Sequence, residues 1–323
     1  MFENMIEKLK TNRQKLIFTE GSDPRILEAT SRLKKEKILE PILLGNPEDI
    51  HTASKQYGFP VNEIEMIDPL TYPAIESMVA TMVELRKGKM DEKTCREALR
   101  KTNYFGTMLV KMGYANGLLG GATYSTADTV RPALQIIKTR PANKIVSSCF
   151  ILYRKTENVE EKYAMADCAI NLNPSEDELV EIALETARTA RIFSMDTRVA
   201  LLSYSTLGSG KGESVDKVRN AATKLKEMHL DFPIDGELQF DAAFSEDVAK
   251  TKASHSPVAG QANTFIFPDI NAGNIGYKIA QRLGNFEAYG PILQGLNAPI
   301  NDLSRGCNAD EVYKMAIITA SLK

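Results

Sequence analysis

The segment KLIFTEGSDPRILEATSRL, from Lys15 to Leu33, shows the repeating unit of the fold. Its first residues form a short apolar run that is typical of a buried strand. Gly21 and Ser22 then predict a turn. Asp23 followed by Pro24 is a usual helix start, because aspartate caps the first N–H groups and proline fits the first helical position. Apolar residues then recur at helical spacing, so the segment predicts a strand followed by a helix.

Short apolar runs keep alternating with stretches of helical period along the chain. PILLG precedes a second helix start, where Asn46 supplies the cap and Pro47 the first-turn proline. Residues 72–113 have the spacing of packed helices. Between Ile145 and Ile170, two apolar runs joined by the charged KTENVEEK predict an antiparallel hairpin. The alternation predicts an α/β fold around a mostly parallel sheet, with a domain boundary at the hairpin.

The composition of the chain argues against several classes of protein. A chain of 323 residues, 43% apolar and 25% charged, is long enough for two domains. Its 40 basic and 42 acidic residues leave no excess positive charge for a nucleic-acid partner. Four scattered cysteines without a CxxC pair, and three histidines, argue against a disulfide scaffold or a structural zinc site. Without an apolar run near the roughly 20 residues of a membrane span, we expect a soluble, cytoplasmic protein with no membrane partner.

Two glycine-rich segments resemble nucleotide motifs but fall short of them. STLGSGKGES lacks the first glycine of a P-loop and has Gly212 where serine or threonine should bind magnesium. AGNIGYKIAQRLG follows a predicted strand, yet Gly273 and Gly276 alone do not complete the dinucleotide fingerprint. We interpret the second segment as a tight strand-to-helix turn, which can still present backbone amides to an anion.

The segment STADTVRPALQ contains an arginine in an unusual place. Ser125 followed by Asp128 predicts a capping box, and Pro132 would then lie in the first helical turn. There Arg131 opposes the helix dipole at a cost of roughly 0.3 to 1 kcal/mol, so it needs an anionic neighbour. That neighbour is either Asp128 or a bound ligand, and the sequence leaves both open.

A second arginine fits a ligand site better. In PINDLSRGCNADEV, Asn308 and Glu311 predict a capping box, which places Ser304 and Arg305 just before a helix N-terminus. Backbone amides, the positive end of the dipole and a guanidinium would converge there, which is an arrangement that binds phosphate. Ser304 adds a hydroxyl, and Asp302, Asp310 and Glu311 add carboxylates.

In this segment and in one other, a purely structural role for the residues is an alternative to a catalytic or metal-binding role. Glu311 can serve only as a cap, and Cys307, with no histidine nearby, is better read as a small buried filler than as a nucleophile. In DGELQFDAAF, the acids Asp235, Glu237 and Asp241 can be read as metal ligands, although caps and surface charges are commoner uses.

Together with these two arginine segments, DGELQFDAA and GNIGYKIAQRLGNFEAYGPILQGLN closely resemble the phosphate acetyltransferase family. The resemblance runs over essentially the whole chain and implies reversible acetyl transfer between acetyl-CoA and inorganic phosphate, giving acetyl phosphate and coenzyme A. Coenzyme A would be a substrate, with no metal or prosthetic group required. The resemblance also implies a homodimer of two-domain subunits like isocitrate and isopropylmalate dehydrogenases, with the active site in the interdomain cleft. The first domain would comprise residues 1–141 plus 291–323, and the second 142–290.

The resemblance also assigns roles to residues. Arg305 corresponds to the arginine that grips the phosphoryl group, and Ser304 to the neighbour that hydrogen-bonds the acyl group. The family's base is an aspartate seven residues after the serine, where this chain has Glu311; we name both Glu311 and Asp310 and prefer Glu311 by position. The remaining residues that the resemblance implies in binding substrate are Arg131, Arg86, Ser125, Thr126 and Gly306, and those implied for coenzyme A are Gly273 and Gly276.

In the resulting mechanism, the acid helps to form the coenzyme A thiolate, which attacks the acetyl group directly without an acyl-enzyme. Phosphate butyryltransferase, or another short-chain acyl phosphotransacylase, is an alternative that differs mainly in the acyl pocket. From another class, a metal- and NAD-dependent decarboxylating dehydrogenase would share the fold and use the DGELQFDAA acids for magnesium, but the dinucleotide fingerprint is missing. A noncatalytic acyl-CoA sensor is disfavoured because we see no fused enzyme in this chain.

Overall fold

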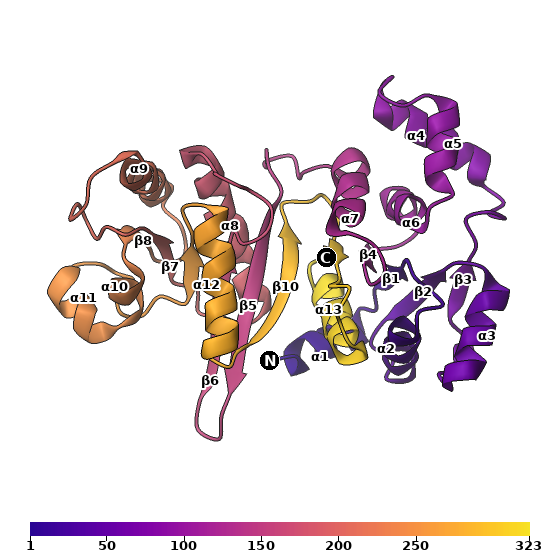
Figure 1. The fold of residues 1–323 in the computed structure, drawn as a ribbon, viewed down its shortest axis with the longest axis horizontal. Helices are drawn as coiled ribbons and strands as arrows, with labels where there is room; N and C mark the ends of the chain where they lie inside the picture. The colour runs from indigo at the N-terminus through magenta and orange to yellow at the C-terminus, as the bar shows by residue number, and fades with distance from the viewer. The chain divides into compact units, whose positions relative to one another are not determined.

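The computed structural model describes residues 1–323, which form two compact units. Unit 1 comprises Met1–Pro141 and Leu296–Lys323, and unit 2 comprises Ala142–Gly295 (Figure 1). The chain therefore leaves unit 1 once and returns to it near the C-terminus. The return lies a few residues beyond the boundary expected at residue 290, because strand β10 (Glu287–Gln294) pairs with unit 2 up to its last residue.

Unit 1 is built on a five-stranded sheet in the order β11-β4-β1-β2-β3. Every neighbouring pair is parallel, as the βα alternation predicts. Leu16, Ile17 and Phe18 in the central strand are fully buried, because helices cover both faces of a parallel sheet. The strands are β1 (Lys15–Phe18), β2 (Glu40–Leu44), β3 (Glu65–Ile67), β4 (Gly117–Gly120) and β11 (Ile300–Asp302).

The helices of unit 1 begin where the sequence predicts caps. Asp23 accepts a hydrogen bond from the Arg25 N–H, and Asn46 accepts one from the Glu48 N–H. In Figure 1, α2 and α13 lie on one face of the sheet and α6 on the other. The helices are α1 (Glu3–Thr11), α2 (Pro24–Lys35), α3 (Pro47–Tyr57), α4 (Ile75–Arg86), α5 (Glu92–Leu99), α6 (Thr102–Lys111), α7 (Thr126–Pro132), the π-helix η1 (Ala133–Ile137) and α13 (Ala309–Ser321).

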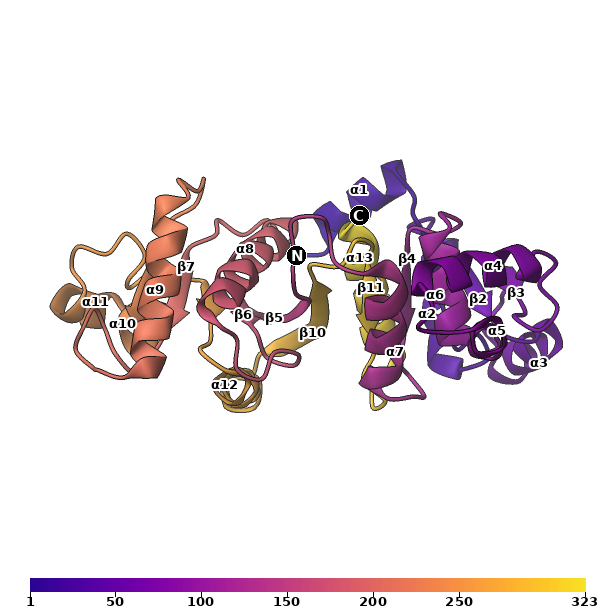
Figure 2. The ribbon, with the colours of Figure 1, turned by 90° about the horizontal axis from the view of Figure 1, so that it is seen from above.

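Unit 2 contains a six-stranded sheet in the order β10-β5-β6-β9-β7-β8. Strands β10, β5 and β6 are antiparallel neighbours, which confirms the predicted hairpin, and the other pairs are parallel. Helices α8 and α12 cover opposite faces of the sheet (Figure 2). The other strands of the sheet are β5 (Ser147–Lys155), β6 (Glu160–Ala166), β7 (Val199–Leu202), β8 (Ile234–Leu238) and β9 (Thr264–Ile266).

The core of unit 2 is apolar and partly aromatic. Phe150, Phe265 and Phe267 belong to one buried cluster, and Tyr277 stacks on Phe150 with ring centroids 4.0 Å apart. The helices are α8 (Glu176–Ile192), α9 (Glu213–Glu227), α10 (Phe240–Phe244), α11 (Glu246–Lys252) and α12 (Ile270–Leu283). None of the helices in either unit combines the length and apolar character needed to cross a membrane.

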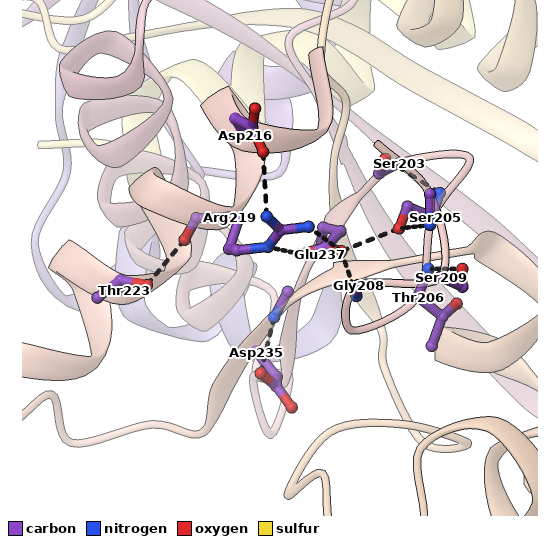
Figure 3. A network of polar contacts seen from close by, with 12 residues as sticks. Ser203, Ser205, Thr206, Gly208, Ser209, Asp216, Arg219, Thr223, Asp235 and Glu237 are labelled. Atoms are coloured by element: carbon purple, nitrogen blue, oxygen red, sulfur yellow. Dashed lines mark hydrogen bonds and ion pairs between the residues drawn. The ribbon is translucent and has the colours of Figure 1, made fainter. Parts of the chain in front are cut away.

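The glycine-rich segment that fails as a P-loop wraps around a buried carboxylate (Figure 3). Glu237 lies in β8 with only 1% of its side chain exposed. It accepts hydrogen bonds from the Ser205 hydroxyl at 2.9 Å and from the Gly208 N–H at 2.7 Å. Arg219 of α9 donates to it through Nε at 3.0 Å and Nη2 at 3.1 Å. The loop between β7 and α9 is therefore folded around a charge of its own unit.

We expect Glu237→Gln to lower the free energy of unfolding by about 2 kcal/mol, because it removes the buried charge that Arg219 binds and turns an acceptor into a donor. Arg219 would keep only its exposed ion pair with Asp216. Chemical denaturation followed by circular dichroism measures the loss. Glu227→Gln at the exposed end of α9 is the matched control and should change stability by less than about 0.5 kcal/mol. Equal stability of the two variants would contradict the structural role of Glu237.

The contribution of Glu237 to the free energy of unfolding should depend on pH. Burial opposes ionisation of Glu237, but the hydrogen bonds from Arg219, Gly208 and Ser205 outweigh it and hold its pKa below the ordinary value of 4.5. Its stabilisation is therefore complete above pH 4.5 and disappears as the pH falls through the lower folded-state value. The gap between wild type and Glu237→Gln should shrink in that acidic range, and a constant gap would contradict this assignment.

Candidate active site

The predicted site residues of unit 1 come together at one edge of its sheet. Strands β11, β4 and β1 are parallel neighbours, so the loops that follow them emerge side by side. Ser304, Arg305 and Gly306 follow β11, and Ser125 and Thr126 follow β4. The Thr126 hydroxyl donates to Asp302 at the end of β11 at 2.6 Å, which joins the two loops directly.

Asp302 is the buried acceptor that fixes the loop after β4. Besides Thr126, the hydroxyl of Thr129 donates to its carboxylate. Burial raises the pKa of Asp302, although these two hydroxyls partly oppose the effect. Gly121 adopts a φ of +101°, and a Cβ there would lie 2.2 Å from Asp302 Oδ1, so the close approach requires glycine. The two loops are thus held at a fixed spacing.

The loop after β11 presents an unpaired guanidinium. Ser304 Oγ accepts from the Gly306 N–H at 3.3 Å, and the Ser304 carbonyl accepts from the Cys307 N–H at 2.9 Å, which forms a tight turn. Ser304, Arg305 and Gly306 are exposed, and the Arg305 guanidinium makes no hydrogen bond or ion pair. A cation held in this way beside a helix N-terminus is available to an anion.

Cys307 does not have the properties of a nucleophile. Its side chain is buried, and burial raises the pKa of the thiol to about 11, although the nearby charge of Arg25 partly opposes the effect. The thiol is therefore almost entirely protonated at neutral pH. This agrees with the interpretation of Cys307 as a small buried filler.

The two acids proposed as the base differ in their surroundings. Asn308 and Glu311 form the predicted capping box of α13, with Glu311 accepting from the Asn308 N–H at 3.2 Å. Asp310 pairs with Arg32 at 3.3 Å and with Lys314 at 2.9 Å. Partial burial opposes ionisation of Asp310, but these pairs hold its pKa below the usual range. Glu311 has no cationic partner, so it is the less constrained acid.

The predicted position of Arg131 was wrong. Helix α7 begins at Thr126 and ends at Pro132, so Arg131 lies in its last turn, where a cation agrees with the helix dipole. Pro132 is tolerated at this end because the Asp128 carbonyl, which would have accepted the missing N–H, accepts from Asn103 Nδ2 at 2.7 Å instead.

The predicted capping box at the start of α7 was also wrong. Ser125 is the N-cap residue, but its hydroxyl accepts no backbone hydrogen bond. It donates instead to the Asp128 carboxylate at 2.7 Å, and this bond and the charge of Arg131 lower the Asp128 pKa. Arg131 makes no ion pair with Asp128 or with any other acid, so it stays available to a ligand.

The charges of Arg86 and Arg131 both act on Tyr104. Arg86 Nη1 donates to the Gln135 carbonyl at 2.9 Å, and the Tyr104 hydroxyl donates to the Gln135 side chain at 2.9 Å. Burial raises the Tyr104 pKa, and the charges of Arg131 and Arg86 oppose that rise. Arg86 Nε is buried without a hydrogen-bond partner. Since buried donors are rarely left unpaired, Arg86 Nε is a candidate donor to an anion.

The glycines predicted to bind coenzyme A lie in α12 of unit 2. A Cβ on Gly273 would come within 2.1 Å of the Asp167 carbonyl oxygen, and one on Gly276 within 3.1 Å of the Phe267 ring. Close packing of the helix therefore accounts for both glycines. Their part in coenzyme binding stays a prediction.

The acids of DGELQFDAAF each engage a different cation. Asp235 pairs with Lys226, Glu237 with Arg219, and Asp241 with Lys252 at 2.8 Å. No group of three metal-ligating side chains gathers in the structure.

Sequence reasoning missed two residues of this sheet edge. Glu20, just after β1, accepts from the N–H groups of Gly121 at 2.9 Å and Thr123 at 3.2 Å. Arg25, in the first turn of α2, donates to three loops. A signal was present, since the argument that a cation in a first turn needs an acceptor applies to Arg25 rather than to Arg131.

Comparisons with known proteins agree with the resemblance. The family model described as "Phosphate acetyl/butaryl transferase" matches residues 1–320. The phosphate acetyltransferase of Bacillus subtilis (strain 168) is 52% identical over 99% of this chain and 98% of its own length. The crystal structure of a phosphotransacetylase from Streptococcus pyogenes is 53% identical and superposes with a TM-score of 0.96, covering 99% and 97% of the two chains.

A more distant structure supports the predicted fold. A putative 4-hydroxythreonine-4-phosphate dehydrogenase from Salmonella typhimurium is 14% identical and superposes with a TM-score of 0.56, covering 96% of this chain and all of its own. This likeness concerns the fold alone and confirms the dehydrogenase-like α/β class. The family model and the relatives at about half identity go further: the chain belongs to the phosphate acetyl/butaryl transferase family of acyltransferases.

Proposed function

We propose that the chain catalyses reversible transfer of an acetyl group between acetyl-CoA and inorganic phosphate. The observation that carries the proposal is the turn before α13, where the Ser304 hydroxyl and the unpaired Arg305 guanidinium stand beside a helix N-terminus. Such a turn suits a substrate with a phosphoryl group next to a reacting carbonyl. The names of the relatives at about half identity support the same reaction.

In the direction that forms acetyl-CoA, the coenzyme A sulfur attacks the carbonyl carbon of acetyl phosphate. A free thiol has a pKa of roughly 8.5, so a carboxylate that takes its proton increases the reactive fraction at neutral pH. Glu311 suits this role better than Asp310, which two cations already hold in its charged form. Glu311 takes the thiol proton as the carbon–sulfur bond forms.

Ser304 and Arg305 act on the other atoms of the reaction. The carbonyl oxygen gains negative charge during the attack, and the Ser304 hydroxyl donates a hydrogen bond to it. The bond between the carbonyl carbon and the phosphate oxygen then breaks, and its electron pair leaves with phosphate. Arg305 neutralises the departing phosphate. In reverse, a phosphate oxygen attacks acetyl-CoA and the coenzyme leaves as the thiol.

Arg86 and Arg131 bind phosphate groups of coenzyme A or of the substrate in this proposal. Ser125, Thr126 and Gly306 complete the binding surface. The hydroxyl of Thr126 is engaged by Asp302, so its contribution is to hold the loop. Coenzyme A is a substrate, and the proposal requires no metal or prosthetic group. We further propose a cytoplasmic homodimer.

Arg305→Met should reduce kcat for acetyl phosphate formation about 100-fold or more, because the departing phosphate loses its counter-charge. The unfolding free energy should change by less than about 0.5 kcal/mol, since the guanidinium has no partner within the protein. A coupled assay and chemical denaturation measure the two quantities. Arg13→Met, which removes an exposed arginine before β1, is the control. Activity close to wild type in Arg305→Met would remove Arg305 from the site.

Glu311→Gln and Asp310→Asn separate the two candidate bases. Glutamine at position 311 retains the capping box, so the helix start is preserved while the basic group is lost. We expect kcat to fall about 100-fold in Glu311→Gln and to fall far less in Asp310→Asn. The opposite order of the two variants would assign the base to Asp310.

Acyl-chain preference tests the alternative within the family. We expect turnover to fall in the order acetyl-, propionyl- and butyryl-CoA at saturating phosphate. Release of free coenzyme A, measured with a thiol reagent, reports all three substrates in one assay. Highest turnover with butyryl-CoA would favour the phosphate butyryltransferase alternative.

A further inference from the structure

Arg25 uses all five N–H donors of its guanidinium inside unit 1. Nε and Nη2 donate to the Asp23 carboxylate at 2.9 and 2.7 Å. Nη2 also donates to the Ala122 carbonyl at 2.9 Å. Nη1 donates to the carbonyls of Arg305 at 2.8 Å and Cys307 at 3.2 Å. No donor remains for a substrate, which distinguishes Arg25 from Arg305.

These acceptors lie in the loops that follow three neighbouring strands. Asp23 follows β1, Ala122 follows β4, and Arg305 and Cys307 follow β11. Arg25 is therefore the one side chain that connects all three loops at the edge where the candidate site lies. The planar guanidinium group is suited to bridging three loops, because it presents N–H donors in several fixed directions.

The turn before α13 depends on this contact. Within the turn, the N–H groups of Gly306 and Cys307 bond back to Ser304. The carbonyls of Arg305 and Cys307 take no part in these bonds and accept hydrogen bonds from Arg25. Losing these bonds would free the turn to shift relative to the loop after β4.

We propose that Arg25 is a positioning residue for acyl transfer. It holds the turn so that the Ser304 hydroxyl and the Arg305 guanidinium contact the same acetyl phosphate molecule. Arg25 itself does not contact the substrate. The inference rests on the proposed function. A displacement of about 1 Å at a reacting group can cost about 100-fold in rate, so the effect of Arg25 should be measurable.

Three variants test the inference. Arg25→Met keeps most of the side-chain length and removes the donors, whereas Arg25→Lys keeps the charge but cannot bridge three loops. We expect kcat for acetyl phosphate formation to fall about 10- to 100-fold in both, with KM for phosphate within about threefold of wild type. Arg13→Met, an exposed arginine before β1, should retain wild-type kcat and KM. Circular dichroism at the assay temperature confirms that each variant is folded.

Chemical rescue distinguishes positioning from a general loss of stability. Guanidinium chloride at millimolar concentration, far below denaturing levels, should raise kcat of Arg25→Ala several-fold with saturation. It should not raise kcat of the wild type or of Arg13→Met. A variant that is merely destabilised would not recover.

Three results would overturn the inference while the wild type is active: kcat of Arg25→Met within twofold of wild type, full activity of Arg25→Lys, or an effect confined to KM for phosphate. The first would show that the turn needs no such support, the second that charge alone matters, and the third that Arg25 contacts substrate. A wild-type chain that forms no acetyl phosphate would instead overturn the proposed function, and with it this role of Arg25.

Discussion

The loops at the sheet edge of unit 1 are held by charged side chains that bond to backbone groups. A loop lacks the regular hydrogen bonds of a strand or helix, so its N–H and carbonyl groups need other partners. Glu20 accepts from the N–H groups of Gly121 and Thr123, and Arg25 donates to three carbonyls in the loops that follow β4 and β11. Asp302 completes the set through the hydroxyls of the loop after β4. The placement of Ser304 and Arg305 depends on these bonds.

This arrangement separates supporting charges from functional ones. Arg25 and Asp302 have partners within the protein and are largely hidden from solvent. Arg305 and Arg131 are exposed and unpaired, and Arg86 keeps one buried donor unsatisfied. Charged groups without partners gain the most from a ligand, because binding replaces no existing internal bond. The distinction favours the unpaired arginines as phosphate ligands and explains why arginine content alone does not identify them.

Structural features that depend on neighbours in the chain could be predicted from the sequence. Features that depend on contacts with distant residues could not. The strand at β1, the caps at Asp23 and Asn46, and the box of Asn308 with Glu311 involve neighbours in the chain, so they were predictable. The placement of Arg131 and Pro132 in the first turn of α7 was wrong. The helix continues to Pro132 because Asn103, 25 positions from Asp128, replaces the hydrogen bond that Pro132 cannot make. Arg25 was missed because its acceptors lie as far as 282 positions away in the chain.

In unit 2 a carboxylate also holds a loop by accepting a backbone N–H, but the shift of its pKa has the opposite direction. Glu237, like Glu20, lies near the end of a strand and accepts a hydrogen bond from a glycine N–H of a neighbouring loop. Arg219 neutralises Glu237 and helps to lower its pKa, whereas burial prevails at Glu20 and raises its pKa. A glycine-rich loop that is bonded to a buried carboxylate of its own unit has already used an N–H group that a phosphate would need. This is a physical reason why STLGSGKGES resembles a P-loop only in composition, and why anion binding in the proposed function falls to arginine side chains.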